Sequence, residues 1–365
     1  MPQQVNIRGG EAIMSICIDA RMINHSGIGT YIRTLLSLAQ SMDLSTILPD
    51  GFQEEGYKDL KSVFSQASIY SLYEQIDIYR KLYKTRNLLF HAPHYNIPLL
   101  YKDKMLVTVH DLIHLKFPQL LPNKAALAYS KFMLNQAGKR AEKIIAVSQN
   151  TKNDLMDMLN IPEEKIQVIY NGLAEYKVHD IDKSTASKSL RKLGVSKRYL
   201  LYVGNVRPHK NIDRLIAAFS IVHRNLNDVE LVITGAAKGK IEDKVVNGIV
   251  FTGFVNNEDL NCLYSNAEIF VFPSLYEGFG FPPLEAMQRG IPVVCSNSSS
   301  LPEVVGDAAL LFDPYEAEDI ADKIMKALTD TSLSAILRDK GREQVRKFSM
   351  KQFQKNMTDL YRSMI

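Results

Sequence analysis

Short apolar runs alternate with stretches of helical periodicity along most of the chain. Towards the N-terminus, the runs with strand character are SICIDA, NLLFHA, KMLVTVH, KIIAVS and QVIYNG, at residues 15–20, 87–92, 104–110, 143–148 and 167–172. Towards the C-terminus, they lie at residues 198–205, 229–235, 248–253, 268–274, 291–296 and 308–313. Between them, apolar residues recur at helical spacing, as at Ile212, Leu215, Ile216, Phe219 and Val222. Strands that alternate with helices predict parallel βαβ units.

The length of 365 residues favours two domains over a single hydrophobic core. Residues 174–196 carry no strong apolar pattern, and we place the linker there. We therefore expect one Rossmann-like α/β domain at 14–180 and a second at 190–345, followed by a helix at 346–365 that packs back towards the first domain. Such domains would face each other across a central cleft at the carboxyl ends of their strands, where doubly wound folds bind ligands.

Composition narrows the class of protein. Apolar residues at 46% and charged residues at 23% are typical of a globular chain, and a net charge of +4 does not indicate nucleic acid as a partner. No run reaches the roughly 18 apolar residues of a membrane span, and residues 1–15 lack the apolar core of a signal peptide. Cys17, Cys262 and Cys295 are far apart, so we expect a reduced, cytoplasmic protein without a metal site.

The segment EGFGFPPLE, at residues 277–285, places two carboxylates across a loop that leads into a short helix. Proline suits the first turn of a helix, where its missing amide hydrogen would have no intrahelical partner. Glycines let the backbone approach a ligand closely, and the free amides at a helix start bind anions. Glu277 and Glu285 would then face one ligand. A tight turn followed by a glutamate favoured by the helix dipole is the alternative.

Other polar residues follow strands. The segment VGNVRPHKN, at residues 203–211, supplies cations, unless it is only a solvated basic turn. Gly27 and Gly29 lie in a predicted strand-turn-helix loop, but the third glycine of a dinucleotide fingerprint is missing, so the loop is either a ligand site of another kind or a simple turn. His110 ends the run KMLVTVH and opens towards the expected cleft, with a structural role as its alternative.

Four separated motifs resemble those of retaining glycosyltransferases of family 4, which have two Rossmann-like domains in the arrangement called the GT-B fold. They are SGIGTYIRTLL, LYVGNVRPHKNIDRLIAAF, SLYEGFGFPPLEAMQRGIPVVCS and SLPEVVGDAALLFDP, at residues 26–36, 201–219, 274–296 and 300–314, in the family's order. The resemblance extends from about Ile16 to the C-terminal helix. Within the family, the chain looks closest to mannosyltransferases that build bacterial polysaccharides.

The resemblance implies a donor site in the C-terminal domain. Glu277 would contact the donor sugar, and the carboxylate of Glu285 would accept hydrogen bonds from the nucleotide ribose. Lys210 would bind the donor diphosphate and stabilise the leaving group. The backbone at Gly278, Phe279, Gly280 and Phe281 would hold sugar hydroxyls or phosphate, and Gly253, Phe254 and Val255 would read the base. The family often has arginine where this chain has Asn205, and we expect Arg207 to take its place.

On the N-terminal side, the resemblance implies that Gly27 and Gly29 face the diphosphate and that His110 contacts the sugar. His94, Tyr95 and Asp111 are candidates for acceptor contacts, with structural roles as the alternative. Residues 124–143 predict a helix that carries basic residues with Tyr129, Phe132 and Met133. This helix either rests on an anionic membrane or packs its apolar stripe on the domain.

We therefore expect an enzyme that moves a hexose, mannose in particular, from a nucleotide sugar to a glycan or lipid-linked glycan in cell-surface polysaccharide synthesis. GDP-mannose is the favoured donor and a UDP-sugar the alternative; no metal or other cofactor is expected. Peripheral contact with the inner face of the membrane is a further hypothesis. The rivals are a sugar-nucleotide epimerase of the same fold and a catalytically silent nucleotide-binding scaffold, and the motifs at 209–211 and 277–285 argue against the epimerase.

Overall fold

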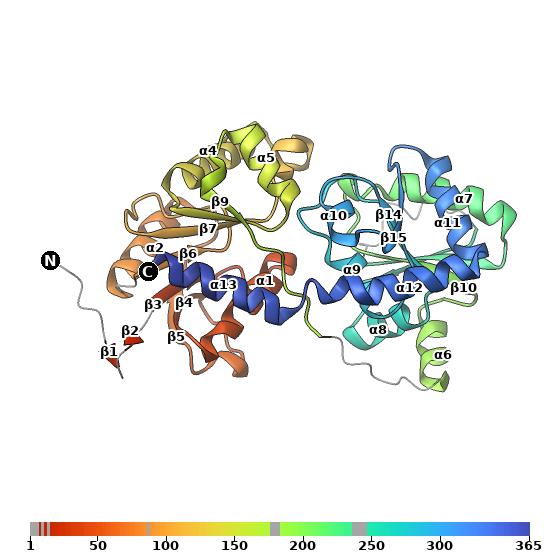
Figure 1. The fold of residues 1–365 in the computed structure, drawn as a ribbon, viewed down its shortest axis with the longest axis horizontal. Coiled ribbons are helices and arrows are strands. Elements are labelled where there is room, and N and C mark those ends of the chain that lie inside the picture. Colours follow the sequence, from red (N-terminus) through yellow and green to blue (C-terminus); the bar gives the residue numbers. More distant parts are fainter. Residues whose placement is uncertain (1–6, 9–10, 13–14, 86–87, 176–182, 236–246) are drawn as a thin grey trace. The chain divides into compact units, whose positions relative to one another are not determined.

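The computed structural model describes the whole chain except residues 1–6, 9–10, 13–14, 86–87, 176–182 and 236–246. The chain divides into two compact units (Figure 1). The first unit comprises Met1–Gly172 with Met350–Ile365, and the second comprises Leu173–Ser349. Each unit contains a parallel sheet flanked by helices, which confirms the predicted class of two Rossmann-like α/β domains.

The first unit has a seven-stranded sheet in the order β5-β4-β3-β6-β7-β8-β9. Its strands are β3 (Ser15–Asp19), β4 (Asp43–Pro49), β5 (Lys61–Ser65), β6 (Leu89–Ala92), β7 (Met105–Val109), β8 (Lys143–Ala146) and β9 (Ile166–Val168). Its helices are α1 (Ser26–Leu36), α2 (Leu72–Thr85), α3 (Ile113–Lys116), α4 (Lys124–Arg140), α5 (Gln149–Leu159) and α13 (Met350–Met364). A short antiparallel pair, β1 (Ile7–Arg8) and β2 (Glu11–Ala12), precedes the sheet.

Two hydrophobic clusters bury the two faces of the first sheet. Successive residues of a strand point to opposite faces, so Ile16 and Ile18 belong to one cluster and Cys17 to the other. Helices α1 and α13 cover the Ile16 face and lie side by side (Figure 1). Their contact includes the rings of Tyr31 and Phe353, whose centroids are 5.9 Å apart. Helices α2, α4 and α5 cover the face of Cys17.

The second unit has a six-stranded sheet in the order β12-β11-β10-β13-β14-β15. Its strands are β10 (Arg198–Val203), β11 (Val229–Thr234), β12 (Ile249–Gly253), β13 (Ile269–Phe272), β14 (Val293–Ser296) and β15 (Ala309–Phe312). Its helices are α6 (Lys183–Lys192), α7 (Ile212–Asn225), α8 (Asn257–Ser265), α9 (Phe281–Gln288), α10 (Leu301–Val305), α11 (Ala317–Thr329) and α12 (Thr331–Arg346). The apolar stripe predicted on α7 is buried.

The boundaries between the units differ from those placed on the sequence. The first unit ends at Gly172 and the second runs from Leu173 to Ser349. Within the expected linker, helix α6 packs on α8, where the Cys262 thiol donates to the Ala186 carbonyl across 3.6 Å and Ser189 hydrogen-bonds to Asp259. Because its apolar side chains are few, α6 gave no strong pattern. Helix α13 returns to the first unit, where Met357 and Leu360 are buried.

Both sheets reverse their strand order at one point. In the first unit, the chain runs outward from β3 through β4 to β5 and then returns to place β6 on the other side of β3. In the second unit, it runs outward from β10 through β11 to β12 and returns to place β13 beside β10. Doubly wound sheets bind ligands at the carboxyl ends of the strands next to such a switch point. Among the described residues, no helix has the length and apolar character that crossing a membrane requires.

Candidate functional site

The loop from β13 to α9 carries the predicted EGFG residues in the second unit. Gly280 has a φ of 119°, and a Cβ there would lie 2.8 Å from Leu301 Cδ2, so this position favours glycine. Helix α9 begins at Phe281, followed by Pro282 and Pro283, which have no amide hydrogens. The amides of Gly280 and Phe281 are therefore the donors that this helix start can offer a ligand. The side chain of Phe279 is buried instead.

Serines that the sequence analysis did not single out hold this loop. Ser299 Oγ accepts a hydrogen bond from the Glu277 amide at 2.9 Å. Ser300 Oγ donates to the carbonyls of Glu277 and Phe279 at 2.9 and 2.7 Å. These serines come from the β14–α10 connection, so a neighbouring strand exit fixes the backbone around Glu277. The run SNSSS at 296–300 is a local signal that could have indicated such a brace.

Lys210 and Glu277 meet at the switch point of the second sheet. Lys210 lies in the 3₁₀ turn η5 (Pro208–Lys210) after β10, and Glu277 follows the adjacent strand β13. Lys210 Nζ is 2.5 Å from Glu277 Oε1, and their side chains are 14% and 16% exposed. The ammonium is also 5.5 Å from the ring centroid of Phe272, within the range of a cation–π contact. The structure thus joins two predicted donor residues that are far apart in the sequence.

The neighbours of Lys210 keep the turn in place. Asn211 has a left-handed backbone, and its Nδ2 donates to the carbonyls of Pro273 and Pro314 at 3.2 and 2.7 Å. The carbonyl of His209 accepts a hydrogen bond from the Leu275 amide at 2.8 Å. Burial, reinforced by the Lys210 charge, lowers the pKa of His209 to about 4, so this imidazole is neutral near pH 7.

Glu285 has a different partner. The hydroxyl of Tyr264, on α8, donates to Glu285 Oε2 at 3.0 Å. Burial, followed by the negative charge of Glu285, raises the pKa of Tyr264 well above its usual value, which keeps the hydroxyl protonated. The Arg289 guanidinium lies 4.5 Å from the Tyr264 ring centroid and donates to the Glu285 carbonyl at 2.9 Å. Tyr264 therefore orients the predicted ribose carboxylate, and Arg289 holds the Tyr264 ring and the Glu285 backbone. The sequence analysis singled out neither residue.

The other donor residues predicted in the second unit lie at strand ends. Asn205 and Arg207 are exposed after β10, and the Asn205 carbonyl accepts a hydrogen bond from the Tyr202 hydroxyl at 3.0 Å. Gly253 ends β12 with a φ of 68°. The next residue, Phe254, is 80% exposed and offers an aromatic face to a planar ligand, whereas Val255 is half-buried.

In the first unit, Gly27 and Gly29 do not lie in a loop. Helix α1 begins at Ser26, so both glycines belong to its first turns, in contrast to the predicted turn. A Cβ on Gly29 would lie 2.3 Å from the Ile23 carbonyl oxygen, which makes glycine a packing requirement there. A Cβ on Gly27 would meet nothing within 4 Å.

His110 follows β7 and has a defined tautomer. Its Nε2 is 2.9 Å from the Pro93 carbonyl oxygen, which can only accept, so Nε2 carries the proton. Burial lowers the pKa of His110 to about 4, and the ring is therefore neutral with Nδ1 as a hydrogen-bond acceptor. The ring of Tyr31 meets it edge-on, with centroids 4.9 Å apart. A neutral acceptor of this kind suits a sugar hydroxyl.

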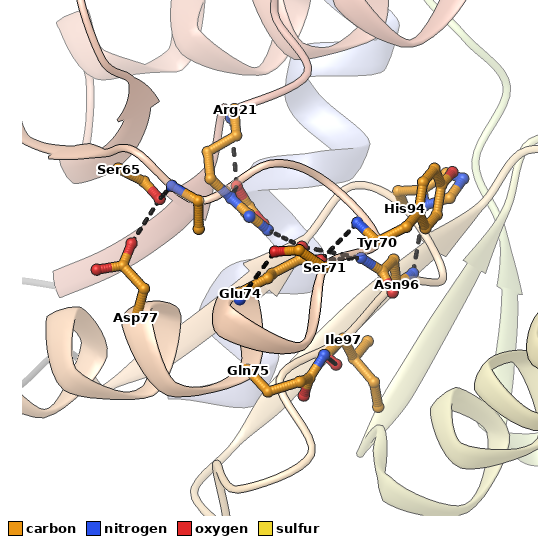
Figure 2. A network of polar contacts seen from close by, with 12 residues as sticks. Arg21, Ser65, Tyr70, Ser71, Glu74, Gln75, Asp77, His94, Asn96 and Ile97 are labelled. Atoms are coloured by element: carbon orange, nitrogen blue, oxygen red, sulfur yellow. Dashed lines mark hydrogen bonds and ion pairs between the residues drawn. The ribbon is translucent and has the colours of Figure 1, made fainter.

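The three candidate acceptor residues have different surroundings. Tyr95 is buried, and its hydroxyl is 3.1 Å from His114 Nδ1. Asp111 Oδ1 accepts a hydrogen bond from the Ile113 amide at 2.9 Å and so shapes the start of α3. His94 is half-buried beside a polar cluster of Asp19, Arg21, Glu74 and Asn96, which the sequence analysis missed (Figure 2). Within the described part of the chain, no group of three or more His, Cys, Asp or Glu side chains is placed to hold a metal ion.

Comparisons with known proteins agree with this arrangement. Residues 185–344 match the family described as Glycosyl transferases group 1, and residues 49–174 match Glycosyltransferase Family 4. O-antigen chain mannosyltransferase B of Escherichia coli is 33% identical over 75% of this chain and 76% of its own length. The serotype-specific mannosyltransferase WbdA of the same species is 30% identical over 67% of this chain, a match that spans 32% of the longer WbdA.

Solved structures share the fold. Sucrose-phosphate synthase from Thermosynechococcus elongatus superposes with a TM-score of 0.77 at 20% identity, over 96% of this chain and 99% of its own. HepE from Anabaena, solved in complex with UDP and glucose, gives a TM-score of 0.75 at 20% identity, over 96% of this chain and 100% of its own. These likenesses show the fold, whereas the sequence matches show the family. The chain belongs to the family 4 glycosyltransferases and is a hexosyltransferase.

Proposed function

We propose that this enzyme transfers mannose from GDP-mannose to a glycan or lipid-linked glycan during synthesis of a cell-surface polysaccharide, with retention of the anomeric configuration. The observation that carries the proposal is the ion pair of Lys210 and Glu277 at the switch point of the second sheet. Two sequence relatives are named as bacterial mannosyltransferases, which supports mannose as the sugar. A UDP-sugar is the second candidate donor, because HepE was solved with UDP.

Lys210 is the proposed partner of the donor diphosphate. Glu277 pairs with the ammonium and holds the cation in place at the carboxyl edge of the sheet. A bound diphosphate would compete for Lys210 and leave the Glu277 carboxylate available to accept hydrogen bonds from the sugar hydroxyls. As the diphosphate leaves, its negative charge grows, and a fixed cation stabilises that charge most in the transition state.

The remaining residues of the second unit would position the donor. Glu285, held by Tyr264, would accept hydrogen bonds from the ribose hydroxyls. The backbone at Gly278 and Phe279, and the amides of Gly280 and Phe281 that follow, would bind the sugar or the phosphate. Beyond them, the segment Gly253–Val255 would contact the base, with Phe254 as a stacking surface. Arg207, near Asn205, would add a second cation.

The proposed reaction needs no covalent enzyme intermediate and no metal. The bond between the anomeric carbon and the β-phosphate oxygen breaks while the acceptor oxygen bonds to the same face of that carbon. The acceptor proton passes to the departing β-phosphate oxygen. His110, with Nδ1 as acceptor, would orient the donor sugar, and Gly27 and Gly29 would place the start of α1 towards the diphosphate.

We also propose that the first unit contacts an anionic membrane, through α2 rather than α4. Helix α4 buries Met133 and Leu134 in the core, whereas α2 leaves a stripe of large side chains exposed from 37% to 90%. The stripe consists of Leu72, Tyr73, Ile76, Tyr79 and Tyr83. Exposed Arg80 and Lys84 lie beside it. Apolar and aromatic side chains flanked by cations fit the interface of an anionic bilayer.

The test is to incubate the enzyme with GDP-mannose or UDP-glucose and a panel of glycosides, in the presence of a chelator. We expect release of GDP and a product whose new linkage keeps the donor's anomeric configuration, as read by NMR coupling constants. An inverted product contradicts the mechanism, and a requirement for a divalent ion contradicts the metal-independent chemistry. An epimerised sugar formed without acceptor would support the epimerase, and donor binding without turnover would support the silent scaffold.

A further inference from the structure

A second polar site lies at the switch point of the first sheet. Strand β3 ends at Asp19 and leads to Arg21, and its neighbour β6 leads to His94 and Asn96. These residues line one small pocket together with Glu74 of α2. Figure 2 shows Arg21 and Asn96 converging on Glu74, with His94 beyond Asn96. The pocket therefore occupies the position in the first sheet at which doubly wound folds bind ligands.

Arg21 keeps one hydrogen-bonding group unused. Its Nε and Nη2 donate to Asp19 at 2.8 and 2.6 Å, and Nη2 also donates to Glu74 Oε1 at 2.6 Å. The Arg21 side chain is only 4% exposed, and its Nη1 is buried without a hydrogen-bond partner. A buried guanidinium nitrogen without a partner is rare in folded proteins, because its desolvation is not compensated.

The acceptors of the cluster are already engaged. The Glu74 carboxylate accepts from Arg21, from Asn96 Nδ2 at 2.8 and 2.9 Å, and from the Tyr70 amide at 2.7 Å. Asn96 Oδ1 accepts from the Tyr129 hydroxyl at 2.6 Å. His94 Nδ1 accepts from the Asn96 amide at 3.3 Å, so the proton of the neutral ring is on Nε2. What the cluster offers a ligand is therefore the donors Arg21 Nη1 and His94 Nε2.

The charge of the cluster selects a neutral ligand. The guanidinium of Arg21 faces two carboxylates, Asp19 and Glu74, which leaves one negative charge in excess. Burial lowers the pKa of His94 to about 3, so this ring adds no positive charge near neutral pH. A phosphate or carboxylate would be repelled, whereas the lone pairs of a hydroxyl oxygen meet the two donors without this cost.

Tyr70 brings an aromatic ring to the same place. Its φ of 69° is a left-handed conformation that a tyrosine adopts only under constraint, and the bond from its amide to Glu74 supplies that constraint. The residue is 47% exposed, and its ring centroid is 6.1 Å from that of His94 and 6.0 Å from that of Tyr129. An exposed, fixed aromatic face suits the apolar C–H face of a pyranose ring.

We propose that Arg21, His94 and Tyr70 form a subsite for one neutral sugar residue of the acceptor. One hydroxyl of the sugar enters the pocket and accepts a hydrogen bond from Arg21 Nη1, while its ring packs on Tyr70. The pocket, at about 10 Å³, has room for a single water-sized group, so the rest of the sugar lies outside it. The inference rests on the proposed function only in naming the bound sugar as the acceptor.

The variant Tyr70→Gly tests this site without threatening the fold, because glycine adopts the left-handed conformation at low cost. Tyr83→Ser, which removes another exposed tyrosine of the same unit, is the matched control. The measurement is saturation-transfer NMR on the full chain with methyl α-mannoside and with the methyl glycosides of other hexoses. We expect binding of at least one glycoside to wild type and Tyr83→Ser, and about tenfold weaker binding to Tyr70→Gly.

A second variant, His94→Phe, keeps an aromatic ring and removes the donor, and it should weaken the same glycoside. Inorganic phosphate should not compete. The proposal is overturned if no methyl glycoside binds wild type, if both variants bind like wild type, or if phosphate displaces the sugar. Thermal unfolding of the same samples with and without GDP separates this subsite from the proposed donor site. If wild type binds a glycoside but GDP does not raise its unfolding temperature, the donor assignment is refuted and this subsite is not.

Discussion

The ammonium of Lys210 lies 2.5 Å from the carboxylate of Glu277, at the junction where β13 pairs with β10. Both residues of the pair belong to the second unit. The ion pair holds both side chains, each less than a fifth exposed, at the carboxyl edge of the sheet. A charge that is already in position costs little reorganisation when a diphosphate binds or leaves, so this geometry links the fold to the proposed chemistry.

The ion pair of Lys210 and Glu277 should contribute to the free energy of unfolding of the second unit. Lys210→Met leaves the Glu277 carboxylate without its cation and should lower the free energy of unfolding of the second unit by about 1–3 kcal/mol. The double variant Lys210→Met/Glu277→Gln removes both charges and should recover most of that loss. Urea unfolding of wild type, Lys210→Met and the double variant measures these free energies. A double variant no more stable than Lys210→Met would show that the pair is not coupled.

Gly27 and Gly29 should respond oppositely to alanine. Gly29→Ala places a Cβ 2.3 Å from the Ile23 carbonyl oxygen and should destabilise the first unit by about 1–3 kcal/mol. Gly27→Ala meets nothing within 4 Å and should stabilise α1 by up to about 1 kcal/mol. Thermal unfolding compares the two. Equal effects would contradict the placement of α1, and a loss of turnover in a stable Gly27→Ala would support close approach of the donor to this helix.

Buried histidines should make the first unit sensitive to acid. Burial lowers the pKa of His91 and His94 to about 3 and of His110 to about 4, against about 6.5 in an unfolded chain. Above about pH 6.5, these histidines are neutral in both the folded and the unfolded protein, and their full contribution to stability is present. As the pH falls towards these lower values, the unfolded chain takes up protons first, so stability drops by about 1.4 kcal/mol per pH unit for each histidine.

Urea unfolding from neutral to acid pH tests this expectation. In His91→Gln, an amide replaces a ring that contacts Tyr361 and Thr108 at 2.6 and 2.8 Å, and the slope of stability against pH should become shallower. An unchanged slope would mean that His91 is protonated in the folded protein.

Membrane contact should depend on α2. The protein should float with liposomes that contain anionic lipid, and it should not float with neutral liposomes or at high salt. Tyr73→Ser/Ile76→Ser should abolish flotation, because both side chains belong to the exposed stripe. Lys124→Ser/Lys131→Ser on α4 is the control and should have a smaller effect. If only the α4 variant loses binding, the surface has been assigned to the wrong helix.

Most of the fold could be predicted, because the apolar runs of buried parallel strands are local signals. Two strands of the first sheet were missed. Strand β4 contains the polar Ser45 and Thr46, whose hydroxyls are satisfied by the Ile16 carbonyl and by Ser62 within the fold, and β5 lies at the edge with few buried residues. A polar residue that finds its partner only in the folded sheet gives no apolar pattern in the sequence.

The site was predictable in part for a similar reason. The motifs around Lys210 and Glu277 were recognisable, but their pairing across 67 residues depends on which strands are neighbours. Arg21 and Glu74 are 53 residues apart, and each reads locally as an ordinary surface charge. The cluster became visible once β3 and β6 were placed side by side.

The central claim is that Lys210 holds the donor diphosphate. Isothermal titration of GDP into wild type, Lys210→Ala and the control Lys323→Ala, with a chelator present, tests it most directly. We predict metal-independent binding to wild type and the control, and about 10- to 100-fold weaker binding to Lys210→Ala, because a hydrogen bond between charged groups is lost. Equal affinity for all three proteins, or binding to wild type that requires a divalent ion, would contradict the account.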